Sequence, residues 1–121
     1  MNRENAGDLT QRFVKETPGV IGVMLVGKDG EPLHVAAASD VDGHRMAAIV
    51  GALVPLAQQT LVEVSRGTLE QAYLKGTDGY VFLFSAGDAG VLVAITAPGA
   101  MVGMIFIGLS RLVADLSSFG T

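Results

Sequence analysis

The stretch that decides the fold covers residues 74–96 and reads LKGTDGYVFLFSAGDAGVLVAIT. Two short turns rich in Gly and Asp, residues 76–79 and 87–90, separate apolar runs of strand length. Such turns supply the backbone conformations that tight β-hairpins need, so the stretch predicts three consecutive hairpin-connected strands. A similar turn at residues 27–30 lies between two further apolar runs and predicts a separate hairpin earlier in the chain.

Three helical patterns surround these strands, at residues 8–16, 43–62 and 100–118. Asp8 is expected to cap the first helix, with Gln11 as the partner in a partial capping box. Either Asp40 or Asp42 is expected to cap the second helix.

The strands expected between the helices are residues 20–26, 31–38, 68–75, 80–85 and 91–96. Residues 20–26 form an uninterrupted apolar run, which is typical of a central strand that is covered on both faces. Pro32 starts the following strand, and proline is confined to sheet edges or strand ends. The order α-β-β-α-β-β-β-α predicts one α+β domain over residues 8–121, preceded by a loose tail of residues 1–7.

The composition narrows the class of protein. The chain has 121 residues, which fit one domain, and a net charge of −4 without any basic cluster, which argues against a nucleic-acid partner. It contains no cysteine, which excludes disulfides and thiolate metal sites and fits a reducing compartment. The polar start leads to no apolar segment soon enough for a signal peptide, so we expect a cytoplasmic protein.

The uncharged run of residues 89–110 is long enough to span a bilayer. It also contains Gly99 and Gly103 at a spacing found in membrane helix dimers. Pro98 interrupts it near the middle, however, and its first half is β-branched and strand-like. This pattern favours a buried strand followed by a buried helix, with a membrane span as the alternative.

The second helix lacks the charged face of an ordinary surface helix, since no charge occurs from residue 46 to residue 62. One face carries apolar residues at helical spacing, namely Met46, Ile49, Val50, Leu53, Ala57 and Leu61. The opposite face is small or uncharged, so we expect a second protein chain to cover it; the alternative is a helix that its own loops cover poorly. Pro55 lies inside the pattern and is expected to kink or split the helix.

The third strand is expected to extend this interface. Leu69 and Tyr73 are spaced for one face, and residues 68–73 have one charge and no proline, so an unpaired edge here would protect itself poorly. We therefore expect the sheet to continue across a homodimer at this edge. The interface predicted from the helix and the strand comprises Ala48, Gly51, Ala52, Pro55, Gln58, Gln59, Val62, Leu69, Gln71 and Tyr73.

Three patterns come close to chemical motifs and fail. Residues 22–29 match a phosphate-binding loop except that Asp29 stands where Ser or Thr would bind magnesium, and a hairpin turn explains them better. Residues 40–43 resemble the start of a calcium loop but lack its later ligands. The two histidines, His34 and His44, have no partner at ligand spacing. We therefore predict no catalytic, cofactor-binding or metal-binding residue, and a protein that is not an enzyme.

Several short segments, spread from about Asp8 to Leu116, carry a resemblance to a known family. They are residues 18–23, 29–33, 67–72, 78–83 and 90–94, together with Gly103. Each alone is a turn beside a strand or a single glycine, but their combined order resembles the roadblock/dynein light chain domain family. The helix that follows the fifth strand favours the bacterial and archaeal branch of that family over the eukaryotic dynein light chains.

The resemblance implies a five-stranded antiparallel sheet in a profilin-like or longin-like sandwich, with the second helix on one face and the terminal helices on the other. It also implies dimers built through the second helix and the third strand. Members of the family bind small Ras-like GTPases or scaffold their complexes, some with sensor kinases, and carry no catalytic residues. The expected function is thus a dimeric regulator or adaptor; a pure assembly scaffold and a small-ligand-sensing domain are the alternatives.

Overall fold

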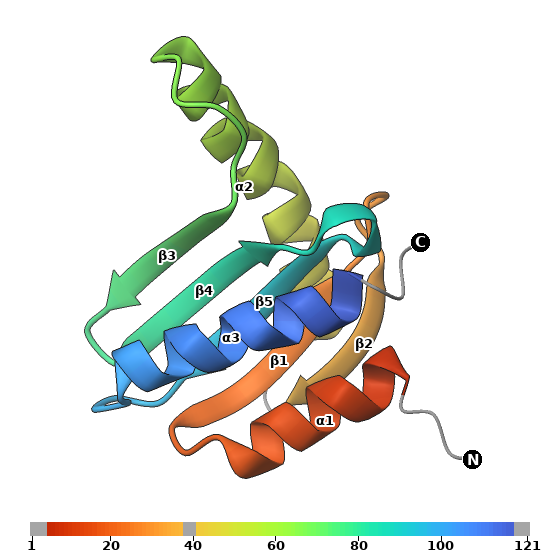
Figure 1. Ribbon diagram of the computed structural model, residues 1–121, viewed down its shortest axis with the longest axis vertical. Helices are drawn as coiled ribbons and strands as arrows, with labels where there is room; N and C mark the ends of the chain where they lie inside the picture. Colours follow the sequence, from red (N-terminus) through yellow and green to blue (C-terminus); the bar gives the residue numbers. More distant parts are fainter. Residues whose placement is uncertain (1–4, 38–40, 118–121) are drawn as a thin grey trace.

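The computed structural model describes residues 5–37 and 41–117. Over these residues the chain forms three α-helices and a five-stranded antiparallel sheet, in the order that the sequence predicts (Figure 1). The predicted α+β class is therefore confirmed. The elements are α1 (Ala6–Glu16), β1 (Val20–Val26), β2 (Pro32–Ala37), α2 (Gly43–Glu63), β3 (Gln71–Gly76), β4 (Gly79–Ser85), the short 3-10 helix η1 (Gly87–Ala89), β5 (Val91–Thr96) and α3 (Val102–Ser117).

The strands lie in the order β2-β1-β5-β4-β3, so β2 and β3 form the two edges of the sheet. Pro32 is the first residue of the edge strand β2, which confirms the edge or strand-end position that it predicted. Strand β1 is internal and is covered on both faces, as its apolar run predicted. Its side chains alternate between two cores, with Val23 and Leu25 on one face and Met24 and Val26 on the other.

Helices α1 and α3 cover one face of the sheet and α2 lies on the other, which confirms the layering that the family resemblance implied (Figure 1). The core beneath α1 and α3 is the larger of the two. It contains Phe82, Phe84 and Leu92 of the sheet, against Ile105 and Leu109 of α3. The core beneath α2 contains six buried residues: Met24, Val26, Ala47, Val50, Leu83 and Val93.

Two glycines of the predicted turns are required by close backbone contacts. Gly79 has a φ of 144° and Gly90 a φ of 119°, a region that side chains rarely allow. A Cβ atom at Gly79 would overlap the carbonyl oxygen of Thr96, and one at Gly90 would overlap that of Val26. The two turns of residues 74–96 therefore need glycine at these positions for β4 and β5 to take their places in the sheet.

The uncharged run of residues 89–110 forms most of β5, a turn and the first half of α3. Leu92, Val93 and Ala94 of β5 are fully buried, as are Ile105 and Leu109 of α3. The predicted buried strand is confirmed. The helix is buried on one side only, because Met104 and Ile107 are mostly exposed, so the predicted buried helix is correct in part. The alternative of a membrane span in this run is wrong, because the run forms a strand, a turn and half of a helix.

Helix α1 begins two residues earlier than predicted. Asn5 is its N-cap, because the Asn5 side chain accepts a hydrogen bond from the backbone N–H of Asp8 at 2.8 Å, and the Asp8 carboxylate accepts one from the backbone N–H of Asn5 at 3.4 Å. Asp8 therefore completes the capping box and does not start the helix, and Gln11 has no part in the box. Ala6 and Gly7, which were expected in the tail, are helical, while residues 1–4 lie outside the described residues.

Helix α2 begins after Asp42, whose side chain accepts a hydrogen bond from the backbone N–H of Arg45 at 3.1 Å; Asp40 lies outside the described residues. The helix continues through Pro55 to Glu63, so of the two effects predicted for this proline the split is wrong, and the kink stays a prediction. Proline removes the N–H that would bond to the carbonyl of Gly51, but Gly51 is exposed and water can satisfy that carbonyl. Strand β3 starts at Gln71, three residues later than predicted.

Candidate interaction surface

Helix α2 leaves most of its surface uncovered. Of its 21 residues, Ala47 and Val50 are buried. Its C-terminal part extends past the sheet in Figure 1. Three large apolar side chains, Ile49, Leu56 and Val62, are 53%, 64% and 60% exposed. Ile49 and Leu56 lie two turns apart on one side of the helix, and exposed apolar surface of this kind is typical of interaction sites in soluble proteins.

The core face predicted for α2 is correct in part. Met46 and Leu53 pack beside the buried Val50, but Ile49 is mostly exposed, so its predicted place in the core is wrong. Successive helix residues project about 100° apart, and the sheet contacts a stripe centred on Val50. Ile49 therefore projects from the flank of the helix, where nothing in the described part of the chain covers it.

The predicted outer face of α2 is exposed at Ala48, Gly51, Ala52, Pro55, Gln59 and Val62. Two of these belong to a stripe that also contains two exposed large residues. We call this the outer stripe; its members are Ile49, Ala52, Leu56 and Gln59, at spacings of three or four that place them on one side of the helix. Leu56 was missed by the sequence reasoning, although its spacing of seven from Ile49 is a signal that could have found it.

Gln58 differs from the other predicted interface residues because its side chain is used within the chain. Its Nε2 donates to the carbonyl oxygen of Gly67 at 3.2 Å, and its Oε1 accepts from the backbone N–H of Leu69 at 2.7 Å. These two bonds hold the segment between α2 and β3 against the helix. Leu69 therefore lies in this connection and not in β3, where it was expected.

The side chains of β3 point to both faces of the sheet. Gln71 and Tyr73 pair with Phe84 and Phe82, which belong to the core of α1 and α3. Tyr73 therefore lies on the α1 and α3 face of β3, because strand side chains alternate, and its place in a dimer interface stays a prediction. The α2 face of β3 instead presents Leu74, which is 53% exposed and was missed by the sequence reasoning. Side chains alternate between the two faces of a strand, so counting back from the Gly76–Gly79 turn could have assigned Leu74 to the α2 face.

The turn at residues 27–30 is a hairpin and not a phosphate-binding loop. It joins β1 to β2, and the Lys28 Nζ forms an ion pair with a carboxylate oxygen of Asp88 at 2.8 Å. The hydrogen bond from Lys28, together with its positive charge, holds the pKa of Asp88 below its usual value. The pair joins the β1–β2 turn to η1 at the same end of the sheet.

A metal site finds no support in the part of the chain that the structure describes. No group of three His, Cys, Asp or Glu residues there could hold an ion. His34 lies on β2 next to Gly7 of α1, whereas His44 lies in the first turn of α2, on the other face of the sheet. Within the same residues, every buried side-chain nitrogen and oxygen has a hydrogen-bond partner.

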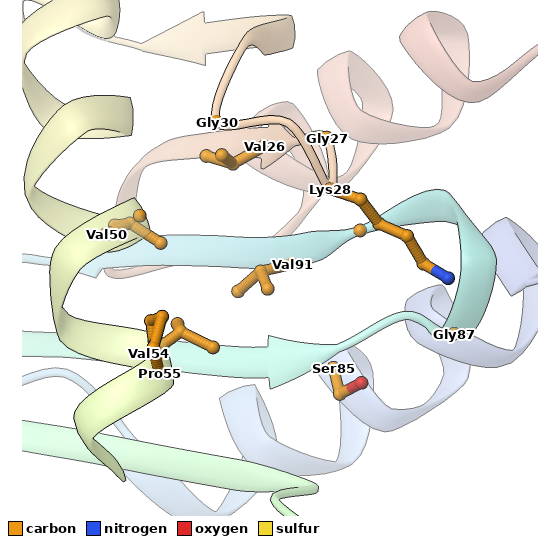
Figure 2. Close-up of a pocket in the computed structure, with 12 residues that line it drawn as sticks. Val26, Gly27, Lys28, Gly30, Val50, Val54, Pro55, Ser85, Gly87 and Val91 are labelled. Carbon is orange, nitrogen blue, oxygen red and sulfur yellow. The ribbon is translucent and has the colours of Figure 1, made fainter. Parts of the chain in front are cut away.

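A cavity of about 400 Å³ opens between α2, the β1–β2 turn and the η1 end of the sheet (Figure 2). In Figure 2 the side chains of Val26, Val50, Val54 and Val91 converge around it, and Lys28 extends along its far side. Gly51 and Pro55 of the predicted interface also line it.

By length and composition alone, α2 is the one described helix that could cross a membrane. Ala47 and Val50 pack against the sheet, and the helix leads through Gln58 into the β3 connection. These contacts make α2 an integral layer of the domain.

Comparison with known proteins connects this arrangement to one family. The Roadblock/LC7 domain matches residues 6–96, a range that includes α2. The uncharacterized proteins MJ0310 and MJ1340 of Methanocaldococcus jannaschii are each 34% identical over 98 residues, covering 81% of this chain and 85% of theirs.

Solved structures share the whole fold. A Roadblock/LC7 domain from Streptomyces avermitilis superposes with a TM-score of 0.86 at 18% identity, covering 96% of this chain and 98% of its own. Myxococcus xanthus MglB superposes with a TM-score of 0.88 at 16% identity, covering 94% of this chain and 93% of its own. The gliding protein MglB of Thermus thermophilus superposes with a TM-score of 0.84 at 16% identity, covering 95% of this chain and 87% of its own. Together, the matched residues and the shared fold place the chain in the Roadblock/LC7 domain family.

Proposed function

We propose that this protein is a non-catalytic, cytoplasmic homodimeric adaptor that binds a small Ras-like GTPase, or a signalling complex that contains one, through α2. The observation that carries the proposal is the exposure of α2, which buries Ala47 and Val50 and leaves Ile49 and Leu56 mostly exposed. Membership of the Roadblock/LC7 family and the shared fold with MglB support the choice of partner.

The outer stripe suits a contact between two copies of the chain. Large residues, Ile49 and Leu56, flank the small Ala52 along one side of the helix. In a two-fold contact the same surface faces itself, so a surface with both protruding and small residues can complement its own copy. An antiparallel second α2 would place its large side chains over the small residue of the first.

The free edge of β3 supports a second part of the same contact. Within the described part of the chain, β3 is bonded to β4 alone, and its α2 face presents the exposed Leu74. An edge that is unpaired and carries little protection tends to pair with another strand. We propose that two β3 edges join the sheets of the dimer, which would also shield Leu74 beneath the second copy.

Regulation of a GTPase would then work through docking. The described arginines lie on helices or next to one: Arg12 on α1, Arg45 and Arg66 at the two ends of α2, and Arg111 on α3. None of these is carried by a long loop that could enter a partner's active site as an arginine finger does. Stimulation would instead follow from preferential binding to one conformation of the partner's switch loops.

The test compares Ala52→Glu with Ala114→Glu. Both residues are exposed alanines on helices, the first in the outer stripe and the second on α3. We expect sedimentation velocity to show a dimer for the wild type and for Ala114→Glu, and a monomer for Ala52→Glu, because like charges would meet at the two-fold contact. A wild type that stays monomeric at micromolar concentration would overturn the homodimer.

Binding to the partner is tested with a Ras-like GTPase from the same genome, loaded with GDP or with a GTP analogue. The adaptor proposal predicts binding that depends on the nucleotide and that Ala52→Glu weakens. Nucleotide-independent binding without any change in turnover would favour the pure assembly scaffold. A single arginine whose loss abolished stimulation while binding stayed intact would contradict the docking mechanism.

A further inference from the structure

The cavity beside α2 continues into a second one along the same flank of the helix. The second cavity measures about 260 Å³ and shares Val54, Pro55, Ser85 and Val91 with the first. It extends toward Leu69 and Gln58, at the connection between α2 and β3. We call the two together the α2 trough. Its combined size falls in the range of small-molecule sites.

The lining of the α2 trough is apolar along its length and charged at one end. Valines from α2, β1 and β5 line the first cavity, and Leu69 and Leu83 line the second. Among the residues that the structure describes, Lys28 is the one titratable group in the lining of either cavity. It stands at the mouth nearest to η1, where its side chain and that of Asp88 are 66% and 71% exposed (Figure 2).

The space exists because glycines, which carry no side chain, line the first cavity. They are Gly27, Gly30, Gly51, Gly87 and Gly90. A Cβ atom at Gly51 would lie 4.0 Å from the Cα of Gly30, which is an ordinary van der Waals distance. A larger side chain at residue 51 would therefore fit without disturbing the helix and would occupy the trough.

The trough and the outer stripe lie on different flanks of α2. Residues two apart on a helix project about 200° apart, so Ile49 points away from Gly51, and Leu56 points away from both Val54 and Gln58. A second copy that covers the outer stripe would leave this flank to another occupant.

We propose that the α2 trough binds an amphiphile with an unbranched apolar chain and an anionic head group. The chain would lie along the valines toward Leu69, and the head group would meet the Lys28 ammonium, which now pairs with Asp88. An acidic head satisfies the charge of Lys28 at the mouth, whereas a cationic head would face it. Because both members of the surface pair are exposed, Asp88 can give way to a ligand carboxylate at small cost.

The test uses 15N-labelled wild-type protein titrated with decanoate, decanol or decyltrimethylammonium, each below its micelle concentration. We expect decanoate to shift the amide resonances of Gly51, Gly87 and Val91, with weaker binding by decanol and weaker still by the cation. Gly51→Leu should weaken the binding of decanoate by about tenfold or more. Its matched control is Gly103→Leu on α3, where a Cβ also has open space, and this change should leave binding unaltered.

Lys28→Gln keeps the proposal testable should Gly51→Leu fold poorly, because Lys28 lies on an exposed turn. Lys28→Gln should weaken the binding of decanoate by several-fold and leave the binding of decanol unchanged. A purely apolar contact would not produce this difference between the two probes. Shifts centred on the exposed Met104 of α3, or equal binding of all three probes, would overturn the proposal. Two results together would also overturn the proposal: decanoate causes no shifts in the wild type, and Gly51→Leu loses GTPase binding. The trough would then bind a side chain of the partner protein. The homodimer is assessed separately by Ala52→Glu, so either idea can fail alone.

Discussion

Helices α2 and α3 have similar composition and opposite surroundings. Each contains a long uncharged stretch, residues 46–62 in α2 and 102–110 in α3, and both pack on the same sheet from opposite sides. Helix α3 buries Ile105, Leu109, Leu112 and Leu116 in the larger core, where α1 packs beside it. Helix α2 buries two small residues, and no other described helix lies on its side of the sheet. Helix α3 thus buries four large side chains inside the chain, although its Met104 and Ile107 stay exposed, whereas α2 leaves most of its apolar surface uncovered.

The largest expected effect comes from a matched pair of leucines. Leu109→Ala on α3 should lower the free energy of unfolding by about 2–5 kcal/mol, because Leu109 is fully buried and leaves a cavity. Leu56→Ala on α2 should change the stability of the isolated chain by less than about 0.5 kcal/mol, because the side chain is exposed. Urea unfolding over a range of protein concentrations checks both values. In a dimer, the Leu56 effect should grow with concentration; equal losses at low concentration would break the contrast.

The next effect concerns the one polar side chain of α2 that ties the helix to the β3 connection. Gln58→Ala removes hydrogen bonds to Gly67 and Leu69 and should lower the free energy of unfolding by about 1–2 kcal/mol. The Leu69 amide should also exchange faster with deuterium. Gln59→Ala is the matched control, because Gln59 is exposed on the outer stripe and its loss should leave the monomer within about 0.5 kcal/mol. Unchanged exchange at Leu69 in Gln58→Ala would contradict the role given to these bonds.

The smallest effect is a pH dependence at the end of the sheet. Lys28 holds the pKa of Asp88 below its ordinary value of 3.8. Since the folded-state pKa is depressed, the stabilising contribution is present above the ordinary value and is lost as the pH falls through the folded value. The contribution should be small and weakened by salt, because both groups are exposed. An NMR titration of the Asp88 carboxyl carbon should show its pKa rise in Lys28→Gln; an unchanged pKa would rule out the pair in solution.

The order of strands along the chain and the two edge strands could be predicted from short-range patterns, whereas the pairing of β1 with β5 could not. Each of these patterns depends on a few neighbouring residues. They are the turns at residues 76–79 and 87–90, the uninterrupted apolar run of β1, and Pro32 at the start of β2. The cap of α1 was misplaced by the same local reasoning, because Asn5 and Asp8 are both residues that cap helices. The lack of charge on the outer α2 face predicted cover by a second chain, with poor cover by the chain's own loops as the alternative; within the chain this face is exposed.

The sequence by itself determined the order of helices and strands, because turn chemistry and hydrophobic periodicity depend on neighbouring residues. Only the tertiary structure decided which flank of each element meets which neighbour. Tyr73 faces the α3 core and Leu74 the α2 face because register with β4 fixes the alternation of β3. Ile49 lies outside the core, Gln58 holds the β3 connection, and the α2 trough stays open because the position of α2 over the sheet depends on contacts between residues far apart in the chain.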